Sequence, residues 1–462
     1  MLPISFVSAV VALLPGLLAS SLPSATGPRV LVVLDHVDNS TLYHRFFSSL
    51  ESQGFRLDYR SFNDPELRLA KDGIPSYDHL ALFSPRLKTL AEGQLLAPAL
   101  VHFVEQGGSI LHAASTDLTE PQRDFAAQWG VEYDNRGTMV LDHANHNHSS
   151  HPSHLLARDL NQNLPFLSHL PTDEPILYEG IGHATVPGLL RTWRALSAPD
   201  TAYSWEIDVP VDSSPALSGP MGLVSVAQAR NGARVTFAGS LSLFSDAFAS
   251  SPVQEDGVTA KALPSGNAKF TDALASWTFQ ASHVLRVVNT SHSPIGPSSS
   301  PEDPHTYRVK DNLTYTAQIH LFSHGSWKSY PLPEIQLEVI MLDPYLRLPL
   351  TFDTDLDAHS ISLTLPDVYG VFTLRALFKR PGWTEIDAKD IIQIRPFHHD
   401  EYPRGLSQAL PYYAGTISTF LAFLLLSLLW LWSREPLSSP PPPSSEKSPS
   451  PPQGKRRATS RK

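Results

Sequence analysis

The chain has 462 residues, no cysteine and a formal net charge of −10. Without cysteine it can form no disulfide, no thiol nucleophile and no thiolate metal site, so its domains must rely on ordinary apolar cores. The acidic balance gives no reason to expect a nucleic-acid ligand, and the length suffices for two or three domains.

The first 22 residues are predicted to form a signal peptide. An apolar run from Val7 to Leu18 is too short to span a bilayer and is followed by small residues at 19–21. We expect cleavage between Ser20 and Ala25, which would direct the rest of the chain into the secretory pathway.

Strand and helix signals alternate through residues 28–285. The expected strands are Arg29–Asp35, Arg56–Phe62, Tyr77–Phe83, Ser109–Ala113 and Val131–Tyr133. The expected helices are one from Ser40 to Gly54, one from Pro98 to Gly107 and one from Pro121 to Trp129. Ser40 is a suitable N-cap for the first helix, in which Leu42, Phe46 and Leu50 would share one face. The alternation predicts a luminal α/β domain with a doubly wound parallel sheet.

The pattern loosens between residues 141 and 220, where we expect a loop-rich insertion with short strands. Order returns as a hairpin of Leu223–Ala229 and Arg234–Ala238, for which Asn231-Gly232 favours a type I′ turn. A helical stripe with Leu274 at its centre completes the α/β domain.

A linker is expected over residues 286–304, because Ser293–Pro304 is rich in serine and proline. Residues 305–400 then alternate apolar and polar side chains with a period of two, as in half-buried strands. The expected strands are Thr306–Val309, Tyr315–Leu321, Ile335–Met341, Ser360–Leu365, Phe372–Phe378 and Ile391–Arg395. Six or seven short strands over this length predict a β-sandwich domain.

Residues 412–432 are uncharged and long enough to cross a bilayer, with aromatic residues at both ends. The tail, residues 433–462, carries a net charge of +5, which leaves −15 on the stretch between residue 28 and the span. Basic flanks remain cytosolic, so we expect a single-pass type I protein with a disordered, proline-rich cytosolic tail. Small residues near the luminal end of the span predict a helix-docking face; they are Ala414, Gly415, Ser418 and Thr419.

Four Asn-x-Ser/Thr sequons are possible N-glycosylation sites in the secretory pathway. They begin at Asn39, Asn147, Asn289 and Asn312.

Three groups of polar residues could carry chemistry. Asp35, His36, Ser84 and Ser115 follow predicted strands, where doubly wound folds place their sites. The domain type resembles glutamine-amidotransferase-like folds, whose cysteine nucleophile is absent here. No GxSxG elbow, Walker loop or GxGxxG turn is present either, so a degenerate site with weak sugar affinity is favoured over catalysis.

The second group is a histidine-rich stretch, and the third consists of acidic residues in the β domain. The histidines are His143, His146, His148, His151 and His154. Zinc sites need fixed ligand spacing on ordered elements, so a solvated loop is favoured. Asp343, Asp367 and Tyr369 could bind calcium or a sugar, but Asp-Pro and Pro-Asp steps are more simply turns. We therefore expect no catalytic, cofactor or metal residue in this chain.

Several segments resemble one family. They are Pro333–Leu350 (PEIQLEVIMLDPYLRLPL), Leu365–Phe372 (LPDVYGVF), Glu401–Arg404, Pro411–Tyr413, Gly107–Leu111 and Gly239–Asp246. From Arg29 to Trp432 the chain resembles the DDOST family, the non-catalytic single-pass subunit of the endoplasmic-reticulum oligosaccharyltransferase (dolichyl-diphosphooligosaccharide–protein glycosyltransferase). Some members end in a dilysine retrieval signal, but the corresponding positions here hold Thr459 and Ser460.

The resemblance implies an accessory subunit of the complex that transfers a glycan from dolichyl diphosphate to asparagine. It further implies an endoplasmic-reticulum membrane location and a role in assembly and substrate positioning. The implied partners are a catalytic multi-spanning subunit, ribophorin-type and small membrane subunits, membrane lipid and, as a candidate, lipid-linked oligosaccharide. Two alternatives stay open: a membrane-anchored luminal hydrolase, which would need a nucleophile or metal set, and a single-pass sugar-binding cargo receptor.

Overall fold

The structure is a computed structural model. It describes residues 22–71, 73–147, 150–171, 174–186, 191–206, 209, 214–254, 263–296, 303–323, 325–402 and 405–433. The chain divides into two compact units, Met1–Pro396 and Phe397–Lys462. The predicted signal peptide and the predicted cytosolic tail lie almost entirely outside the described residues.

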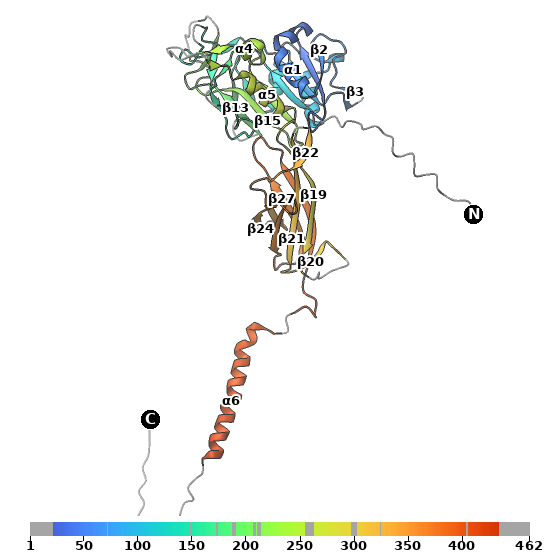
Figure 1. The fold of residues 1–462 in the computed structure, drawn as a ribbon, viewed down its shortest axis with the longest axis vertical. Helices are drawn as coiled ribbons and strands as arrows, with labels where there is room; N and C mark the ends of the chain where they lie inside the picture. The colour runs from blue at the N-terminus through green and yellow to red at the C-terminus, as the bar shows by residue number, and fades with distance from the viewer. Residues whose placement is uncertain are drawn as a thin grey trace, which may run out of the picture. The chain divides into compact units, whose positions relative to one another are not determined.

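The first unit begins with an α/β sheet that has a parallel centre, as the sequence predicted (Figure 1). The parallel strands are β1 (Arg29–Leu34), β2 (Arg56–Ser61), β5 (His79–Phe83), β6 (Ser109–Ala113) and β16 (Arg234–Ala238). They lie in the order β2-β1-β5-β6-β16. Because β2 and β5 flank β1 on opposite sides, the topological switch point lies between the carboxyl ends of β1 and β5.

Helices cover both faces of this sheet. They are α1 (His44–Ser52), α2 (Leu96–Glu105), α3 (Glu120–Gln128) and α5 (Asn267–Thr278). Val32 of β1 lies in one core with Phe46 of α1 and Leu274 of α5. Leu31, the preceding residue, lies in the other core with Leu100 of α2. A strand whose successive side chains enter opposite cores is buried on both faces, which explains its unbroken apolar sequence.

The helix predicted to begin at Ser40 begins later. Val37–Tyr43 form a 3-10 helix (η1) without a side-chain cap, and Leu42 is exposed. α1 starts at His44 and buries Phe46 as expected. A 3-10 helix has three residues per turn instead of 3.6, so Tyr43 takes the buried position expected for Leu42.

The stretch 141–220 contains short strands, as predicted, and several of them extend the main sheet. They are β9 (Leu155–Ala157), β10 (Asp159–Leu160), β11 (Ile176–Tyr178), β12 (His183–Thr185), β13 (Thr192–Ser197) and β14 (Tyr203–Glu206). β10, β12 and β13 join the sheet in antiparallel pairings, with β13 paired to β15 (Gly222–Gln228). This stretch therefore completes the α/β sheet.

The remaining elements of this region are short. They are β3 (Ala70–Lys71), β4 (Ile74–Pro75), η2 (Ala91–Gly93), β7 (Val131–Tyr133), β8 (Thr138–Leu141), η3 (Ser242–Phe244), α4 (Asp246–Ser250), β17 (Pro252–Val253) and β18 (Leu263–Pro264). Among them β7 joins the main sheet by pairing with β12.

The predicted hairpin is present as β15 and β16, but the expected type I′ turn is wrong. Within the turn only Gly232 has a positive φ, of 89°, whereas a type I′ turn needs two such residues. The Gly232 N–H donates to the carbonyl of Ala229, and the Ala229 N–H donates to the carbonyl of Ala233. These bonds describe a longer loop in which a single left-handed glycine follows a type I turn. Asn231 instead donates its side-chain amide to α2 through the carbonyl of Val104.

The second part of the first unit is a β-sandwich of two five-stranded sheets. One contains β19 (Val284–Pro294), β21 (Asn312–Ser323), β22 (Ser326–Ser329), β25 (Thr351–Asp353) and β26 (Ala358–Thr364). The other contains β20 (Thr306–Arg308), β23 (Gln336–Ile340), β24 (Pro344–Pro349), β27 (Gly370–Phe378) and β28 (Ile386–Arg395). Tyr315 of the first sheet donates its hydroxyl to Asp390 of the second, at 3.1 Å.

β19 differs from the expectation, because residues 286–294 form this long strand where a linker was expected. All of its pairings are with β21, through a single register irregularity. The Ile295 N–H, just beyond this strand, still donates to the carbonyl of Asn312 at 2.8 Å.

A buried arginine joins the α/β part to the β-sandwich. Arg234 of β16 is fully buried and donates to the carbonyls of Trp277, Ser282 and His283, each at 2.7 Å. Its guanidinium lies 4.8 Å from the centre of the Trp277 ring. The Trp277 indole N–H in turn donates to the carbonyl of Gly382 in the β-sandwich, at 2.7 Å. One hydrogen-bonded group therefore connects β16, α5 and the turn between β27 and β28.

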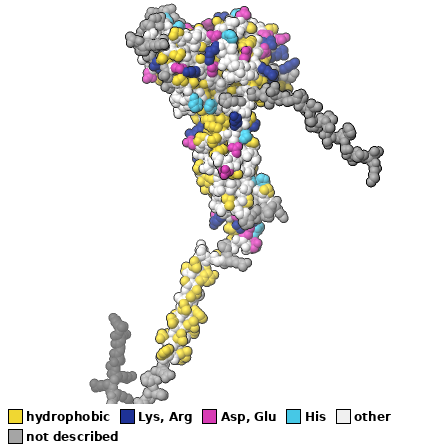
Figure 2. All heavy atoms as spheres, viewed as in Figure 1, with side chains coloured by type: hydrophobic (Ala, Val, Ile, Leu, Met, Phe, Trp, Pro, Cys, Tyr) yellow, Lys and Arg dark blue, Asp and Glu magenta, His cyan; other side chains and the backbone are white. Residues whose placement is uncertain are grey.

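The second unit contains the helix α6 (Leu410–Trp432), preceded by a short 3-10 helix, η4 (Ser407–Ala409). Apolar side chains cover it, as Figure 2 shows. The span Ser407–Trp432 has a mean hydropathy of 2.0 and no acidic or basic residue. At 1.5 Å per residue its length matches a bilayer, as the sequence predicted.

Candidate functional site

The topological switch point brings together two of the predicted polar residues. Asp35 follows β1, Ser84 follows β5, and the Ser84 hydroxyl donates to Asp35 Oδ1 at 2.5 Å. A second oxygen of Asp35 lies 3.9 Å from Nε of Arg86. The Ser61 hydroxyl donates to the backbone carbonyl of Asp35, which fixes the end of β1 against β2. The carboxylate is therefore held by neighbouring strands.

The other two predicted residues of this group do not join the pair. His36 is exposed at the start of η1, and Ser115 lies in the turn after β6. Within the described part of the chain, neither makes a side-chain hydrogen bond with Asp35 or Ser84.

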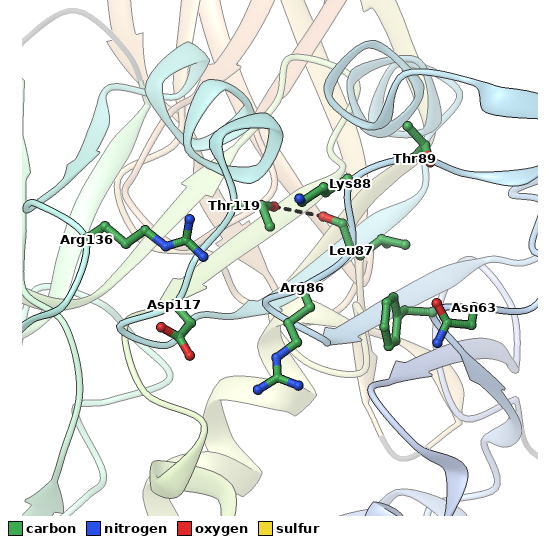
Figure 3. A pocket seen from close by; sticks show the side chains of 9 residues that line it. Asn63, Arg86, Leu87, Lys88, Thr89, Asp117, Thr119 and Arg136 are labelled. Carbon is green, nitrogen blue, oxygen red and sulfur yellow. Dashed lines mark hydrogen bonds between the residues drawn. The ribbon is translucent and has the colours of Figure 1, made fainter.

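A hollow of about 530 Å³ opens beside this pair, and three cationic side chains line it (Figure 3). We call it the basic pocket; its lining residues are Phe62, Asn63, Arg86, Leu87, Lys88, Thr89, Asp117, Thr119 and Arg136. They come from segments that follow β2, β5, β6 and β7. The carboxyl ends of parallel strands are the usual place for a ligand in this type of sheet.

A buried hydrogen-bond network holds the loop that carries Arg86 and Lys88. Gln122 of α3 donates its side-chain amide to the carbonyls of Ser84 and Leu87, at 2.8 and 3.0 Å. The Gln122 carbonyl oxygen lies 2.9 Å from Nε2 of His112, which must therefore donate. Nδ1 of His112 is then free to accept from the Tyr133 hydroxyl, at 3.3 Å.

Burial sets the charge state of this network. It lowers the pKa of His112 to about 4, against a smaller opposing effect of the Gln122 hydrogen bond. Burial also raises the pKa of Tyr133. Both side chains are neutral near pH 7, so the network orders the loop without adding charge to the pocket.

The sequence did not single out Arg86, Lys88 or Arg136. The first two could have been found, because Pro85–Lys88 is a short cationic loop immediately after a buried strand. Arg136 lies between β7 and β8, and no local pattern indicates that this loop approaches β5.

The histidine-rich stretch forms no metal site within the described residues, where no group of three potential ligands is close enough. His143 hydrogen-bonds the Tyr203 hydroxyl at 2.9 Å, and His154 packs edge-on against Phe248. His151 lies 3.1 Å from the Ser153 hydroxyl. His148 lies outside the described residues.

The acidic residues of the β domain lie in exposed turns. Asp367 pairs with Lys310 at 2.7 Å, and the carbonyl of Asp343 accepts from the N–H of Met341. Tyr369 is exposed beside these turns.

An exposed apolar patch lies between the same turns. Its members are Leu342, Tyr345, Tyr369, Val371 and Ile391. The segments are adjacent, because Thr373 pairs with both Ile340 and Ile391, and the Tyr345 ring packs on Phe372 at 5.5 Å. The exposed fractions of the five side chains run from 44% at Tyr345 to 95% at Leu342.

The four sequons differ in their surroundings. Asn289 and Asn312 are exposed on strands β19 and β21, and Asn39 is half-buried in η1. The Asn147 side-chain oxygen accepts from the N–H of Gln254, at 3.0 Å.

The hydroxyls near the start of α6 bond to the helix itself. Ser418 and Thr419 both donate to the carbonyl of Gly415, at 2.9 and 2.8 Å. A Cβ added at Gly415 would meet nothing within 4 Å. Ala414 and the other three predicted docking residues are exposed on the helix.

Comparison with known proteins identifies the family. Residues 21–281 match the family described as "OST48, N-terminal domain", and residues 295–434 match "OST48 middle domain". This chain belongs to the OST48 family. The resemblance to DDOST stated from the sequence is thereby confirmed.

Relatives of the OST48 family align with nearly the whole chain. A Danio rerio protein is 35% identical over 412 residues, which cover 88% of this chain and 92% of the relative. An Arabidopsis thaliana protein is 34% identical, covering 90% and 95%. A Caenorhabditis elegans protein is 29% identical, covering 91% and 96%. Each bears the name dolichyl-diphosphooligosaccharide–protein glycosyltransferase 48 kDa subunit.

Among solved structures, the carbohydrate deacetylase Agd3 aligns with a TM-score of 0.27 and 10% identity. The alignment covers 46% of this OST48 chain and 29% of Agd3. A superposition at that level establishes neither a shared fold nor a shared activity.

Proposed function

We propose that this chain is an accessory, non-catalytic subunit of oligosaccharyltransferase, the complex that transfers a glycan from dolichyl diphosphate to asparagine in Asn-x-Ser/Thr sequences. The observation that carries the proposal is the family match, which extends from residue 21 through the membrane span. The relatives that are named as 48 kDa subunits of this enzyme align over about nine-tenths of the chain.

The geometry of the switch point supports a non-catalytic role. Ser84 donates its hydroxyl to a carboxylate, whereas an activated serine needs a base such as histidine within hydrogen-bond reach. The nearby His112 is buried and already engaged on both ring nitrogens by Gln122 and Tyr133. The whole sequence also contains no cysteine that could serve as a nucleophile.

The apolar patch supports a role in assembly. Leu342 and Tyr345 come from the segment Pro333–Leu350, and Tyr369 and Val371 come from the segment Leu365–Phe372. Both segments carry the family resemblance, and all four side chains are exposed. Exposed apolar side chains that gather on neighbouring segments of a folded domain mark interaction sites. We assign this patch to contact with another protein subunit of the complex, because the family match points to a multi-subunit enzyme.

The small residues of α6 support a second contact, inside the bilayer. Gly415, Ser418 and Thr419 satisfy their polar groups within the helix, so a partner helix can approach closely without leaving a hydroxyl unpaired in lipid. We assign this face to the catalytic multi-spanning, ribophorin-type or small membrane subunits, with membrane lipid around the remaining surface.

The remaining features agree with a type I protein of the endoplasmic-reticulum membrane. The tail after the span carries +5, and the stretch before it carries −15. Basic flanks remain on the cytosolic side, which supports a luminal position for the α/β domain and the β-sandwich. There they would help to position the lipid-linked oligosaccharide or the acceptor chain.

Two experiments test this function. The full chain, purified alone in mild detergent, is expected to transfer no glycan from lipid-linked oligosaccharide to an acceptor peptide and to hydrolyse none. Turnover that Asp35→Ala abolishes would instead support a hydrolase or transferase in this chain.

The assembly surface is tested by co-purification. Leu342→Asp should lower the yield of partner subunits, whereas Leu356→Asp, at an exposed turn elsewhere in the β-sandwich, should leave it unchanged. Because the chain has no cysteine, Leu342→Cys also gives a single site for cross-linking to a partner. Equal yields from the two aspartate variants would remove the patch from the interface.

A further inference from the structure

The basic pocket holds more positive charge than nearby carboxylates neutralise. Arg86 is 63% exposed, and its ion-pair partner, Asp35, lies 3.9 Å away and already accepts a short hydrogen bond from Ser84. Lys88 and Arg136 form no ion pair with any carboxylate among the described residues. The only acidic side chain in the lining set is Asp117.

This charge is unusual for its surroundings, since the stretch between residue 28 and the span carries −15 overall. Three cations around one hollow repel each other, and an anion placed between them would relieve that repulsion. Arginine guanidiniums match phosphate oxygens in a bidentate geometry, and a lysine adds a point charge.

The uncharged side chains that line the pocket could contact a group attached to a bound phosphate. Phe62 provides an aromatic ring, Asn63 a side-chain amide and Thr89 a hydroxyl. At about 530 Å³ the hollow lies within the size range of small-molecule sites, which run from roughly 300 to 1,000 Å³. A phosphate group alone would leave most of this volume unfilled, whereas a phosphate carried on a sugar-sized group would occupy it.

Hydrogen bonds to the backbone hold the loop that carries Arg86 and Lys88 in place. The Thr119 hydroxyl donates to the carbonyl of Leu87 at 2.8 Å, the bond drawn in Figure 3, and Gln122 donates to the same carbonyl. A loop fixed in this way loses little conformational freedom when a ligand binds between Arg86 and Lys88.

From these observations we infer that the basic pocket binds a phosphate-bearing ligand, with Arg86, Lys88 and Arg136 around the phosphate and Phe62 beside the attached group. The inference concerns this pocket alone and does not depend on membership of the oligosaccharyltransferase complex. Phosphate of this kind could come from a soluble sugar phosphate or from a lipid-linked phosphate.

The test is calorimetric titration of the full chain in mild detergent with four probes: glucose 1-phosphate, farnesyl phosphate, citrate and glucose. We expect saturable binding of at least one phosphate probe with a Kd below about 1 mM. Arg86→Gln and Arg136→Gln should each weaken that binding at least about fivefold, since each removes a charge-assisted contact. Arg56→Gln is the matched control. Arg56 is an exposed cation at the amino end of β2, whereas the basic pocket lies at the carboxyl ends of the parallel strands.

Each outcome decides the inference. Tighter binding of glucose 1-phosphate identifies a soluble source and tighter binding of farnesyl phosphate a lipid-linked one, provided that Arg86→Gln weakens it and Arg56→Gln does not. The inference is overturned if no phosphate probe saturates, if citrate or glucose binds as tightly, or if all three variants have the same effect. Unchanged melting temperatures of the variants show that lost binding is not lost folding.

Discussion

Arg234 offers the sharpest test of how the two parts of the first unit are joined. Arg234→Met removes three charge-assisted hydrogen bonds, to the carbonyls of Trp277, Ser282 and His283, and a longer one to the Thr384 hydroxyl at 3.5 Å. The Trp277 carbonyl keeps a bond from the N–H of Gln280, and the His283 carbonyl keeps one from Thr384. Among the described residues, no other hydrogen bond reaches the Ser282 carbonyl, which would then be left without a donor.

The magnitude follows from opposing contributions. Three hydrogen bonds to a charged group stabilise the fold by roughly 5–9 kcal/mol, and an unsatisfied carbonyl costs about 1–3 kcal/mol more. Against this, burial lowers the pKa of Arg234 from 12.5 to about 9, which corresponds to about 5 kcal/mol of lost hydration that methionine would not incur. The net destabilisation expected for Arg234→Met is therefore about 4 kcal/mol, the midpoint of these contributions.

The assay is thermal unfolding of the full chain in mild detergent. Unfolding is monitored by tryptophan fluorescence, to which the buried Trp277 contributes. For a unit of about 375 residues, an unfolding entropy of about 2.1 cal/mol/K per residue converts this loss into a decrease of about 5 °C in Tm. Arg230→Met is the matched control, because Arg230 is exposed in the loop between β15 and β16. Equal melting temperatures for the two variants would show that Arg234 does not hold the junction.

Three further predictions concern stability, docking and glycan attachment. Burial lowers the pKa of His112 to about 4 and that of His183 to about 3, so both stay neutral in the folded chain while the unfolded chain takes up protons below about pH 6.5. Their contribution to stability is therefore complete above pH 6.5 and falls as the pH drops to about 4 for His112 and about 3 for His183, by about 2 kcal/mol for each at pH 5. Tm should fall from pH 7 to pH 5, and less so in His112→Asn; a Tm that does not change would contradict this. Gly415→Leu should at least halve the yield of co-purified partner subunits by separating helix backbones, whereas Leu425→Ala should not; the reverse order would place the docking face elsewhere. Asn289→Gln should increase mobility on a denaturing gel by the loss of one glycan, and unchanged mobility would show that this sequon is unoccupied.

The pattern of buried strands could be predicted from sequence because it is local. In β1, every residue after Arg29 has an apolar side chain, as a strand buried on both faces requires. Leu42 shows where such local prediction fails. A periodic pattern does not tell a 3-10 turn from an α turn, and this difference decides whether Leu42 faces the core. Asn231 is a second example, because the hydrogen bond that its side chain donates to Val104 competes with the turn that its sequence favours.

The candidate site was predictable only in part, for a topological reason. Asp35 and Ser84 end adjacent parallel strands, so the alternation of strands and helices was enough to bring them together. Arg136 reaches the same hollow from a loop whose position depends on β7 pairing with β12, about 50 residues further along the chain. Such pairings depend on the whole sheet and leave no periodic signal in the sequence around Arg136.

The central claim, a non-catalytic subunit of oligosaccharyltransferase, is tested most directly by complementation. Sequon occupancy on secretory proteins is measured in cells depleted of this chain and supplied with wild type, with Asp35→Ala/Ser84→Ala, or with Leu342→Asp. We predict that depletion lowers occupancy, that the Asp35→Ala/Ser84→Ala chain restores it as well as wild type does, and that Leu342→Asp does not. Normal occupancy after depletion, or failure of an Asp35→Ala/Ser84→Ala chain that still co-purifies with its partners, would contradict the claim.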